Sequence, residues 1–553
     1  MTDKLFKAVL SALISLALFL SCKSDDPVIT SIYPKIGNLG DVITLTGRNF
    51  GEAREDAYIT IAGIAPTGSS YLLWQDDMIM LRIPEMGESG LIYIHTRGKK
   101  SNGILFSNIA TVPKPVDGEE PGFGPRIASI NPQGGTTGSI IKITGSNFGI
   151  SRENGGVFFL WENSSPLINP YAVNEPEFIE VSEIEMGYVS WNTREIQVRL
   201  PDGAVSGNVE VRTPHGSSRP VFFDVSGTPG FKKFTDKRTY TVSYSVDIRV
   251  LEASMPNTLY LWVPKPVISP SQRNISLISR SMEPFVENHK GVSLFKLDNL
   301  GIGSVKSINI SYLVDVYSKE TEINPQLLRQ PTSPQTPSQT TPLSVMYTQS
   351  SDLIPVNSQQ LRTTVNSIIG REQNPYLKAR LIYNWIVSNI QLVENMNFPS
   401  GVFDAVIEHK QADSYMITLL YAAMARIAGI PCIPAAGILI DRSGQQTKLH
   451  YWAEFWLNDF GWVPTDPAAG TGSIAEVFIS KEDPAGFYFG NMDNNRIAFS
   501  RGEIILSQME NRGRLVSLTQ SYSLQNIWEE ASGGLESYNS LWGDVIISGI
   551  YVQ

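Results

Sequence analysis

The sequence predicts a multidomain chain in which all-β sandwiches are followed by a β-domain and an α+β core. The chain has 553 residues, which is too long for one hydrophobic core. An internal repeat of short strands, punctuated by Gly and Pro, occupies the first 226 residues. Helical periodicity is found from residue 375 onwards, so we expect helices in the C-terminal core.

Composition and charge exclude several classes of protein. Hydrophobic residues make up 42% and charged residues 18%, a balance typical of a globular chain and not of a disordered one. The net charge of −10 provides no basic surface for phosphates, so we expect no nucleic-acid partner. Only Cys22 and Cys432 are present, too few for a disulfide framework or a CxxC metal site. We expect neither a metal nor a cofactor.

The first 26 residues have the pattern of an export signal. Lys4 and Lys7 precede an apolar stretch that is too short to span a bilayer, which predicts a signal peptide over residues 1–21. The run ending in Ser21-Cys22 resembles a bacterial lipobox, although Leu18 lies one position earlier than usual. The resemblance implies lipid attachment at Cys22, a tether over 22–26 and a membrane anchor at the bacterial cell envelope. We expect the anchor to lie in the outer membrane, on either its periplasmic face or the cell surface. An ordinary secretory signal is the alternative.

A repeat with a period of 98 residues organises the N-terminal part. Residues 29–56 and 127–154 share 14 identities in 28 positions without a gap. The shared residues are mainly turn residues and the apolar residues of strands. Phe50 and Phe148 recur within the same T-G-x-N-F-G motif, where we expect them to fill a core between strands. Short strands with such turns predict two β-sandwiches.

The paired S-I-x-P and T-G-x-N-F-G motifs are similar to those of the IPT/TIG family of immunoglobulin-like domains. The resemblance covers residues 27–112 and 125–226, with a linker over 113–124. It implies either spacers that project the C-terminal region or modules that bind a ligand directly, and we favour spacers. The second copy has an insertion that begins at Trp161, where an exposed aromatic could stack on a sugar.

Alternating strand patterns continue in a third β-region over residues 229–326. Val242, Tyr244, Val246 and Ile248 are expected to share one face of a strand. Residues 327–352 contain a Pro/Ser/Thr/Gln tract that cannot bury a core, which predicts a flexible or extended linker. The remaining residues, 353–553, are predicted to form the α+β domain.

Two helices and three strands are predicted in the part of this domain that bears the motifs. Apolar residues at helical spacing predict an amphipathic helix over 375–390. A second helix, over 413–428, is apolar almost all round and is therefore expected to be buried; Gly429 ends it. Strands are predicted over 432–440, 451–457 and 462–464.

Four motifs in this region look like those of the transglutaminase-like core, a branch of the papain-like thiol enzymes. They are Lys378 to Ile386, Arg426 to Pro431, the sequence His450-Tyr451-Trp452-Ala453-Glu454, and Gly461 to Pro467. The resemblance implies a cysteine at the start of the buried helix, with His450 and Asp466 as its supporting groups. It also implies that Trp452, Glu454 and Trp462 support the cleft. The alternative is that these three side chains only pack in the hydrophobic core.

The chemistry of such a site follows from its groups. A thiol at a helix N-terminus beside an imidazole ionises readily, and its pKa falls to about 3 to 4. An aspartate behind the imidazole fixes its tautomer and stabilises its charged form. His450 and Asp466 are candidates for these two roles.

The position that the family pattern gives to the nucleophile holds Ser414. A serine has no accessible oxyanion near pH 7, so it works only through general-base catalysis. Three interpretations are open: Asp413 or Ser414 caps the helix, the cleft binds a partner without cleaving it, or Ser414 is a hydrolase or acyltransferase nucleophile. Cys432, a substitute nucleophile in principle, lies in an apolar strand and is more typical of a buried small hydrophobe.

We therefore expect a degenerate triad of Ser414, His450 and Asp466 in a pseudoenzyme that binds or organises an envelope protein or glycan. The alternative is an active amide hydrolase or acyltransferase that uses the same three residues. A structural stalk or adhesin with an inert head is a third class.

Overall fold

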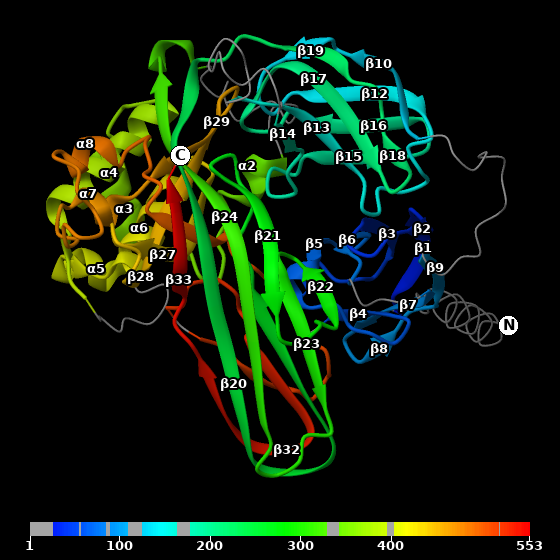
Figure 1. Ribbon diagram of the computed structural model, residues 1–553. Coiled ribbons are helices and arrows are strands. Elements are labelled where there is room, and N and C mark those ends of the chain that lie inside the picture. The colour runs from blue at the N-terminus through cyan, green and yellow to red at the C-terminus, as the bar shows by residue number, and fades with distance from the viewer. Residues whose placement is uncertain are drawn as a thin grey trace, which may run out of the picture. The chain divides into compact units, whose positions relative to one another are not determined.

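The computed structural model describes residues 26–54, 57–84, 89–108, 124–162, 177–328, 342–394, 403–518 and 520–552. The predicted signal peptide and Cys22 lie outside the described residues. The chain divides into two compact units, Met1–Asp117 and Gly118–Gln553. Strands are the dominant element in both units (Figure 1). The fold class predicted from the sequence is confirmed.

The first unit is a β-sandwich. One sheet has the strand order β1-β3-β6-β5, and the other has β2-β9-β7-β4 with β8 paired to β7. The strands are β1 (Val28–Tyr33), β2 (Ile36–Gly37), β3 (Val42–Arg48), β4 (Tyr58–Ile61), β5 (Tyr71–Trp74), β6 (Met78–Arg82), β7 (Gly90–Thr96), β8 (Lys99–Lys100) and β9 (Ile104–Asn108). Inward-facing residues of both sheets form one core around Phe50, which is fully buried.

The second unit opens with a sandwich of the same design. Its sheets have the orders β10-β12-β16-β15 and β11-β19-β17-β13-β14, with β18 paired to β17. The strands are β10 (Arg126–Asn131), β11 (Gly134–Gly135), β12 (Ile140–Ser146), β13 (Gly156–Trp161), β14 (Phe178–Glu180), β15 (Tyr188–Trp191), β16 (Glu195–Arg199), β17 (Ala204–Thr213), β18 (Gly216–Ser217) and β19 (Val221–Val225).

The repeat in the sequence is a repeat in the structure. β1 pairs with β3, and β10 with β12, in registers that differ by the same 98 positions, and each pair has its irregularity at the equivalent place. Phe148 is buried like Phe50, as predicted. Gly51 and Gly149 have φ of +96° and +89°, a conformation that a side chain would strain.

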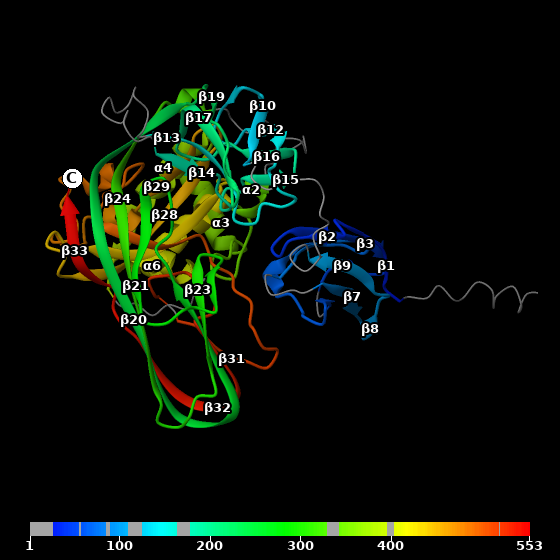
Figure 2. The same cartoon turned by 45° about the vertical axis from the view of Figure 1, so that its right-hand side comes forward.

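The β-domain is built on β20 (Gly230–Pro264), a strand of 35 residues. It lies beside β24 (Val305–Ile323) over most of that strand's length (Figure 2). β21 (Gln272–Arg280), β22 (Val286–His289) and β23 (Val292–Asp298) complete the sheet from this part of the chain. Val242, Tyr244, Val246 and Ile248 are all buried, which confirms the face predicted for them.

The last strands of the chain also belong to this sheet. β31 (Arg514–Val516) pairs with β32 (Glu529–Trp542), and β32 and β33 (Ile546–Val552) both pair with β20. The prediction that residues 353–553 form one separate domain is therefore wrong at its C-terminal end. β20 has a second edge to pair, and Trp528 and Leu535 enter the core of the β-domain.

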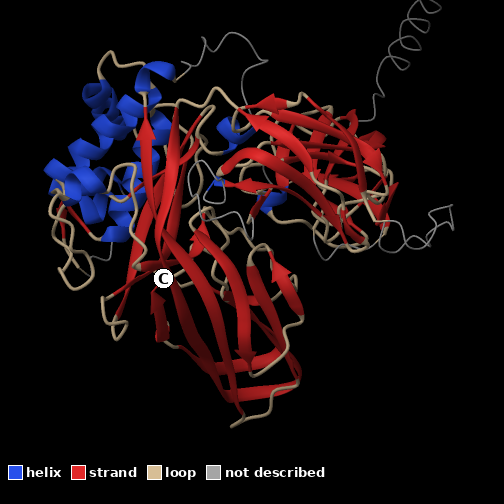
Figure 3. Ribbon diagram, turned by 45° about the horizontal axis from the view of Figure 1, so that its top comes forward, coloured by secondary structure: helices blue, strands red, loops and turns tan. Residues whose placement is uncertain are grey.

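In the sequence, the α+β core lies between β24 and β31 of the β-domain. Its sheet has the order β29-β28-β27-β30, and its helices gather on one side (Figure 3). The elements are α3 (Gln359–Ile369), α4 (Pro375–Asn389), β25 (Gln391–Leu392), α5 (Phe403–His409), β26 (Gln411–Ala412), α6 (Ser414–Ile427), β27 (Cys432–Ile440), β28 (Thr447–Leu457), β29 (Gly461–Thr465), α7 (Pro467–Gly470), α8 (Pro484–Phe487) and β30 (Arg496–Arg501).

Both predicted helices are confirmed as α4 and α6, and the three predicted strands as β27, β28 and β29. Residues 415–426 of α6 are all buried, which agrees with the apolar pattern around this helix. α6 packs on the face of β28 that presents Tyr451, Ala453 and Phe455.

The structure describes both ends of the predicted linker. The short helices η5 (Pro325–Leu327) and α2 (Pro342–Met346) flank residues 329–341. This range, which contains the Pro/Ser/Thr/Gln tract, lies outside the described residues. Leu343 is buried against Trp462, and Arg426 donates a hydrogen bond to the carbonyl of Gln349 at 3.0 Å. The C-terminal part of the linker is therefore bound to the core, because it has apolar side chains to bury.

The second sandwich is joined to the β-domain and the core by buried contacts. Lys232 of β20 forms an ion pair with Asp202, and both side chains are almost inaccessible to solvent. Trp161 packs against Phe234 and Tyr317 and is 1% exposed, so it is not the exposed aromatic considered above. This sandwich is part of the same compact unit as the core, whereas the first sandwich forms a unit of its own.

Candidate functional site

Ser414 is the first residue of α6 and is half-buried. The residue before it, Asp413, is the N-cap: its carboxylate accepts a hydrogen bond from the backbone N–H of Met416 at 2.8 Å. The second oxygen of Asp413 accepts from Gln520 at 2.9 Å. The capping function therefore belongs to Asp413, and the Ser414 hydroxyl is not needed for it.

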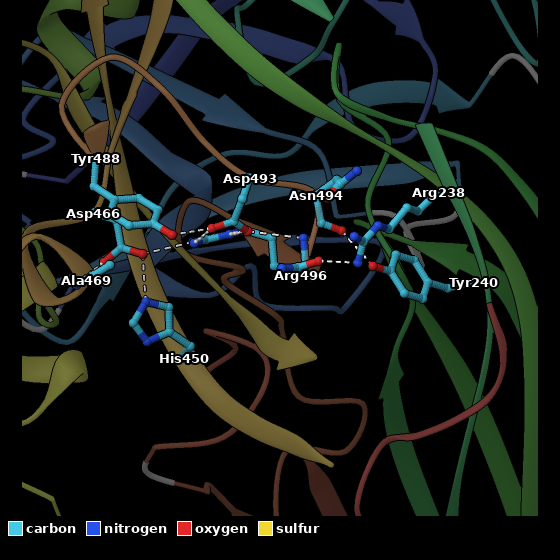
Figure 4. A network of polar contacts seen from close by, with 10 residues as sticks. Arg238, Tyr240, His450, Asp466, Ala469, Tyr488, Asp493, Asn494 and Arg496 are labelled. Atoms are coloured by element: carbon cyan, nitrogen blue, oxygen red, sulfur yellow. Dashed lines mark hydrogen bonds and ion pairs between the residues drawn. The ribbon is translucent and has the colours of Figure 1, made fainter. Parts of the chain in front are cut away.

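His450 and Asp466 are brought together by two antiparallel strands. His450 lies in β28, and Asp466 follows β29, which pairs with β28 through Ala453 and Thr465. His450 Nε2 lies 2.7 Å from Asp466 Oδ2 (Figure 4). Asp466 is also the N-cap of α7, where its other oxygen accepts from the Ala469 N–H at 2.9 Å.

Arg496 of β30 is a further member of this site. Its Nη1 lies 2.9 Å from Asp466 Oδ2, and its remaining nitrogens contact Asp493, which also accepts from the Tyr488 hydroxyl. Sequence reasoning missed Arg496, because one arginine in a strand has no spacing that marks it. The signal that was available is its position in an apolar strand, where an arginine must find acidic partners.

These contacts determine the ionisation of the carboxylates. Burial opposes the charge of Asp466, but the attraction of His450 and Arg496 outweighs it and lowers the carboxyl pKa to about 2. Burial also opposes the charge of Asp493, and Arg496 again outweighs it, so the pKa of this carboxyl is lowered as well. Both carboxylates are therefore ionised near pH 7.

The second ring nitrogen of His450 has no hydrogen-bond partner among the described residues. His450 is 1% exposed, and its Nδ1 forms no hydrogen bond to any residue that the structure describes. A hydrogen bond from the Ser414 hydroxyl to His450 is therefore absent within these residues. Such a bond is what makes a serine a nucleophile under general-base catalysis. The structure brings His450 and Asp466 together and does not connect Ser414 to them.

The three predicted cleft residues are buried. Trp452 is 5% exposed, stacks on the ring of His450 and lies under the Arg496 guanidinium. Glu454 forms a buried ion pair with Arg501. Trp462 is fully buried beside Trp456. Trp452 therefore touches the site, Glu454 is held by Arg501, and Trp462 packs against Trp456.

Cys432 is not positioned to replace Ser414. Its partner across the strands is Phe455, whereas His450 pairs with Gly437, five positions along β27, so about 17 Å separates the two places. An odd separation also places the two side chains on opposite faces of the sheet. Burial raises the pKa of the Cys432 thiol to about 12, so no thiolate forms near pH 7.

Among the described residues, no three His, Cys, Asp or Glu side chains converge to hold a metal ion. Within the same ranges, no helix is long and apolar enough to cross a bilayer.

The comparisons with known proteins identify the domain types. Residues 362–467 match the family model of the transglutaminase-like superfamily, which spans α4, α6, His450 and Asp466. Residues 27–109 and 125–169 match the IPT/TIG domain. These matches agree with the α+β core and the two sandwiches.

Similar proteins have been found, at low identity. An uncharacterized protein of Haemophilus influenzae is 25% identical over 308 residues, which are 48% of this chain and 80% of that protein. A protein of Cytophaga hutchinsonii, provisionally assigned to the cysteine proteases, is 14% identical over 58% of this chain and 92% of its own, with a TM-score of 0.35. The periplasmic domain of TgpA from Pseudomonas aeruginosa is 12% identical over 44% and 91%, with a TM-score of 0.25. The chain therefore contains a transglutaminase-like domain and IPT/TIG domains within a mostly β, multidomain architecture.

Proposed function

We propose that the protein is an exported, membrane-anchored lipoprotein that binds or organises a protein or glycan partner at the bacterial cell envelope. In this proposal the transglutaminase-like domain lacks its cysteine nucleophile and binds without amide chemistry. The observation that carries it is the unpaired Nδ1 of His450, which no nucleophile engages within the described residues. Ser414 stands where the family pattern has the cysteine.

The physical reason is the difference between oxygen and sulfur. A cysteine beside His450 would exist as a thiolate before substrate arrives, whereas a serine must lose its proton to a base in the transition state. That loss requires a hydrogen bond to the imidazole, and Ser414 makes none to His450. The His450–Asp466 pair is then a buried structural contact that holds β28 against the residue after β29.

The export part of the proposal depends on the first 26 residues. Radioactive palmitate supplied to cells that make the full chain is expected to label the wild type and not Cys22→Ser. A matched Cys432→Ser variant should label normally. Labelling that persists in Cys22→Ser would contradict lipid attachment at this residue.

The binding part is tested with isolated envelope fragments. The purified full chain is expected to sediment with them, and Ser414→Ala is expected to sediment equally well, because the hydroxyl has no function in binding chemistry here. Treating the fragments with a protease beforehand distinguishes a protein partner from a glycan. No sedimentation above that of serum albumin would contradict the proposal.

A second candidate function has one observation in its favour. Asp466, Asp493 and Arg496 form a buried group with a net charge of −1, which would stabilise a protonated His450 during catalysis. On this reading the protein is an amide hydrolase or acyltransferase that uses Ser414, His450 and Asp466. Labelling of the wild type by an activated serine-directed phosphonate, with loss in Ser414→Ala, would establish it. Equal labelling of both proteins would exclude Ser414 as the labelled nucleophile.

A further inference from the structure

A polar pocket of about 280 Å³ lies between the start of the β-domain and the α+β core, within one compact unit. Arg238 of β20 and Ser318 of β24 line it from the β-domain. Ser480, Lys481 and Asn495 line it from the core. It is separate from Ser414 and owes nothing to the binding function proposed above.

Two cations of this pocket have no carboxylate partner within the described part of the chain. The Arg238 guanidinium donates to the side-chain oxygen of Asn495, and the Lys481 ammonium lies 3.9 Å from the centre of the Phe487 ring. Neither forms an ion pair with a residue that the structure describes. The buried carboxylate of the pocket, Asp493, is already engaged by Arg496. An exposed carboxylate, Asp236, also lines the pocket, so the lining carries two cations and two carboxylates.

The wall of the pocket is held in place by hydrogen bonds. The Tyr240 hydroxyl donates to the Asn494 carbonyl at 2.8 Å, and the Asn494 amide donates to the Asp236 carbonyl. Tyr488, which also lines the pocket, donates its hydroxyl to Asp493 and is fully buried. Figure 4 shows Tyr240, Asn494, Asp493 and Tyr488 in a row that continues to Asp466. The pocket is therefore preformed, and a ligand would not have to order it.

We infer that this pocket binds an oxyanion, the carboxylate or phosphate group of a small ligand or of the end of a larger one. A guanidinium presents paired N–H donors that match a carboxylate or a phosphate, and an ammonium adds a point charge. The hydroxyls of Ser318 and Ser480 add neutral donors. The volume is at the lower end for ligand sites, which fits one charged group and not a long apolar chain.

Calorimetric titration of the purified full chain tests the inference, with inorganic phosphate and acetate as separate probes at low ionic strength. We expect saturable binding of at least one probe. Arg238→Gln and Lys481→Gln should each weaken it about tenfold or more, since a hydrogen bond to a charged group is lost. Arg219→Gln and Lys306→Gln are matched controls at exposed positions outside the pocket, and they should bind like the wild type.

The titrations distinguish the two classes of oxyanion. Binding of phosphate alone identifies a phosphate-type ligand, and binding of acetate alone identifies a carboxylate; both support the site. Lys481 is exposed, so Lys481→Gln is expected to fold normally and keeps the test informative if Arg238→Gln does not fold. The inference is overturned if neither probe binds, or if Lys481→Gln binds as tightly as the wild type.

Discussion

His450 and Asp466 lie 2.7 Å apart in a fully buried contact, although the helix of the same domain that the family pattern assigns to the nucleophile begins with a serine. The fold therefore keeps the histidine–aspartate pair that would assist a nucleophile, although the nucleophile position itself holds a serine. Arg496 binds the same oxygen of Asp466 and gives the pair a structural partner that does not depend on catalysis.

Replacing Asp466 should destabilise the domain. Asp466→Asn removes a carboxylate whose pKa is lowered from 3.8 to about 2, which corresponds to about 2 kcal/mol of folding free energy at neutral pH. Because the folded pKa lies below the unfolded one, this stabilisation is present above about pH 4 and is lost as the pH falls through about 2. Urea unfolding of both proteins at pH 7 measures it. Equal midpoints at pH 7 would contradict the assignment.

The ion pair between Lys232 and Asp202 should hold the second sandwich to the β-domain. Lys232→Met leaves a buried carboxylate without a partner, a change that costs about 3 to 5 kcal/mol. Lys233→Met, one residue along β20, breaks an exposed pair with Glu322 and should cost less than about 1 kcal/mol. Urea unfolding compares them. Similar losses in both variants would show that burial of the Lys232 pair has no special weight.

Because Glu162 is buried, the folded protein should lose stability as the pH rises above about 4.5. Burial raises its carboxyl pKa to about 7, although Lys232 acts against this. The folded pKa exceeds the unfolded value of about 4.5, so stability falls as the pH rises from about 4.5 through about 7. Glu162→Gln keeps the oxygen that accepts from the Lys232 N–H, and at pH 8 it should be more stable than the wild type by about 3 kcal/mol. Unfolding curves at pH 5 and pH 8 measure the difference; the same pH dependence in both proteins would refute it.

Cys432 should be chemically inert in the folded protein. Its thiol is fully buried and its pKa is raised to about 12. In a Cys22→Ser chain, where Cys432 is the remaining cysteine, iodoacetamide at pH 8 should label only after urea is added. Rapid labelling of the native protein would reopen the question of a substitute nucleophile.

Much of the fold could be predicted from local patterns. The strand predicted over 432–440 is β27 residue for residue, and the repeat correctly placed both sandwiches and their buried phenylalanines. The helices α4 and α6 also follow their periodicity, because each has an apolar face that the core buries.

What could not be predicted depends on contacts between distant residues. β33 pairs with the part of β20 around Tyr240, about 310 positions earlier, and neither strand has a local signal for the other. The burial of Lys232 was missed because a lysine in a strand is expected at the surface unless its partner is known. Arg496 was missed for the same reason. His450 and Asp466 were predicted because they stand in a recognisable sequence motif.

The central claim concerns the oxygen of Ser414, and turnover of a glutamine-containing peptide by the wild type and by Ser414→Cys tests it most directly. Our account predicts no hydrolysis or acyl transfer by the wild type and measurable turnover by Ser414→Cys, because the cysteine would supply the thiolate that His450 and Asp466 can support. Wild-type turnover that disappears in Ser414→Ala would contradict the account.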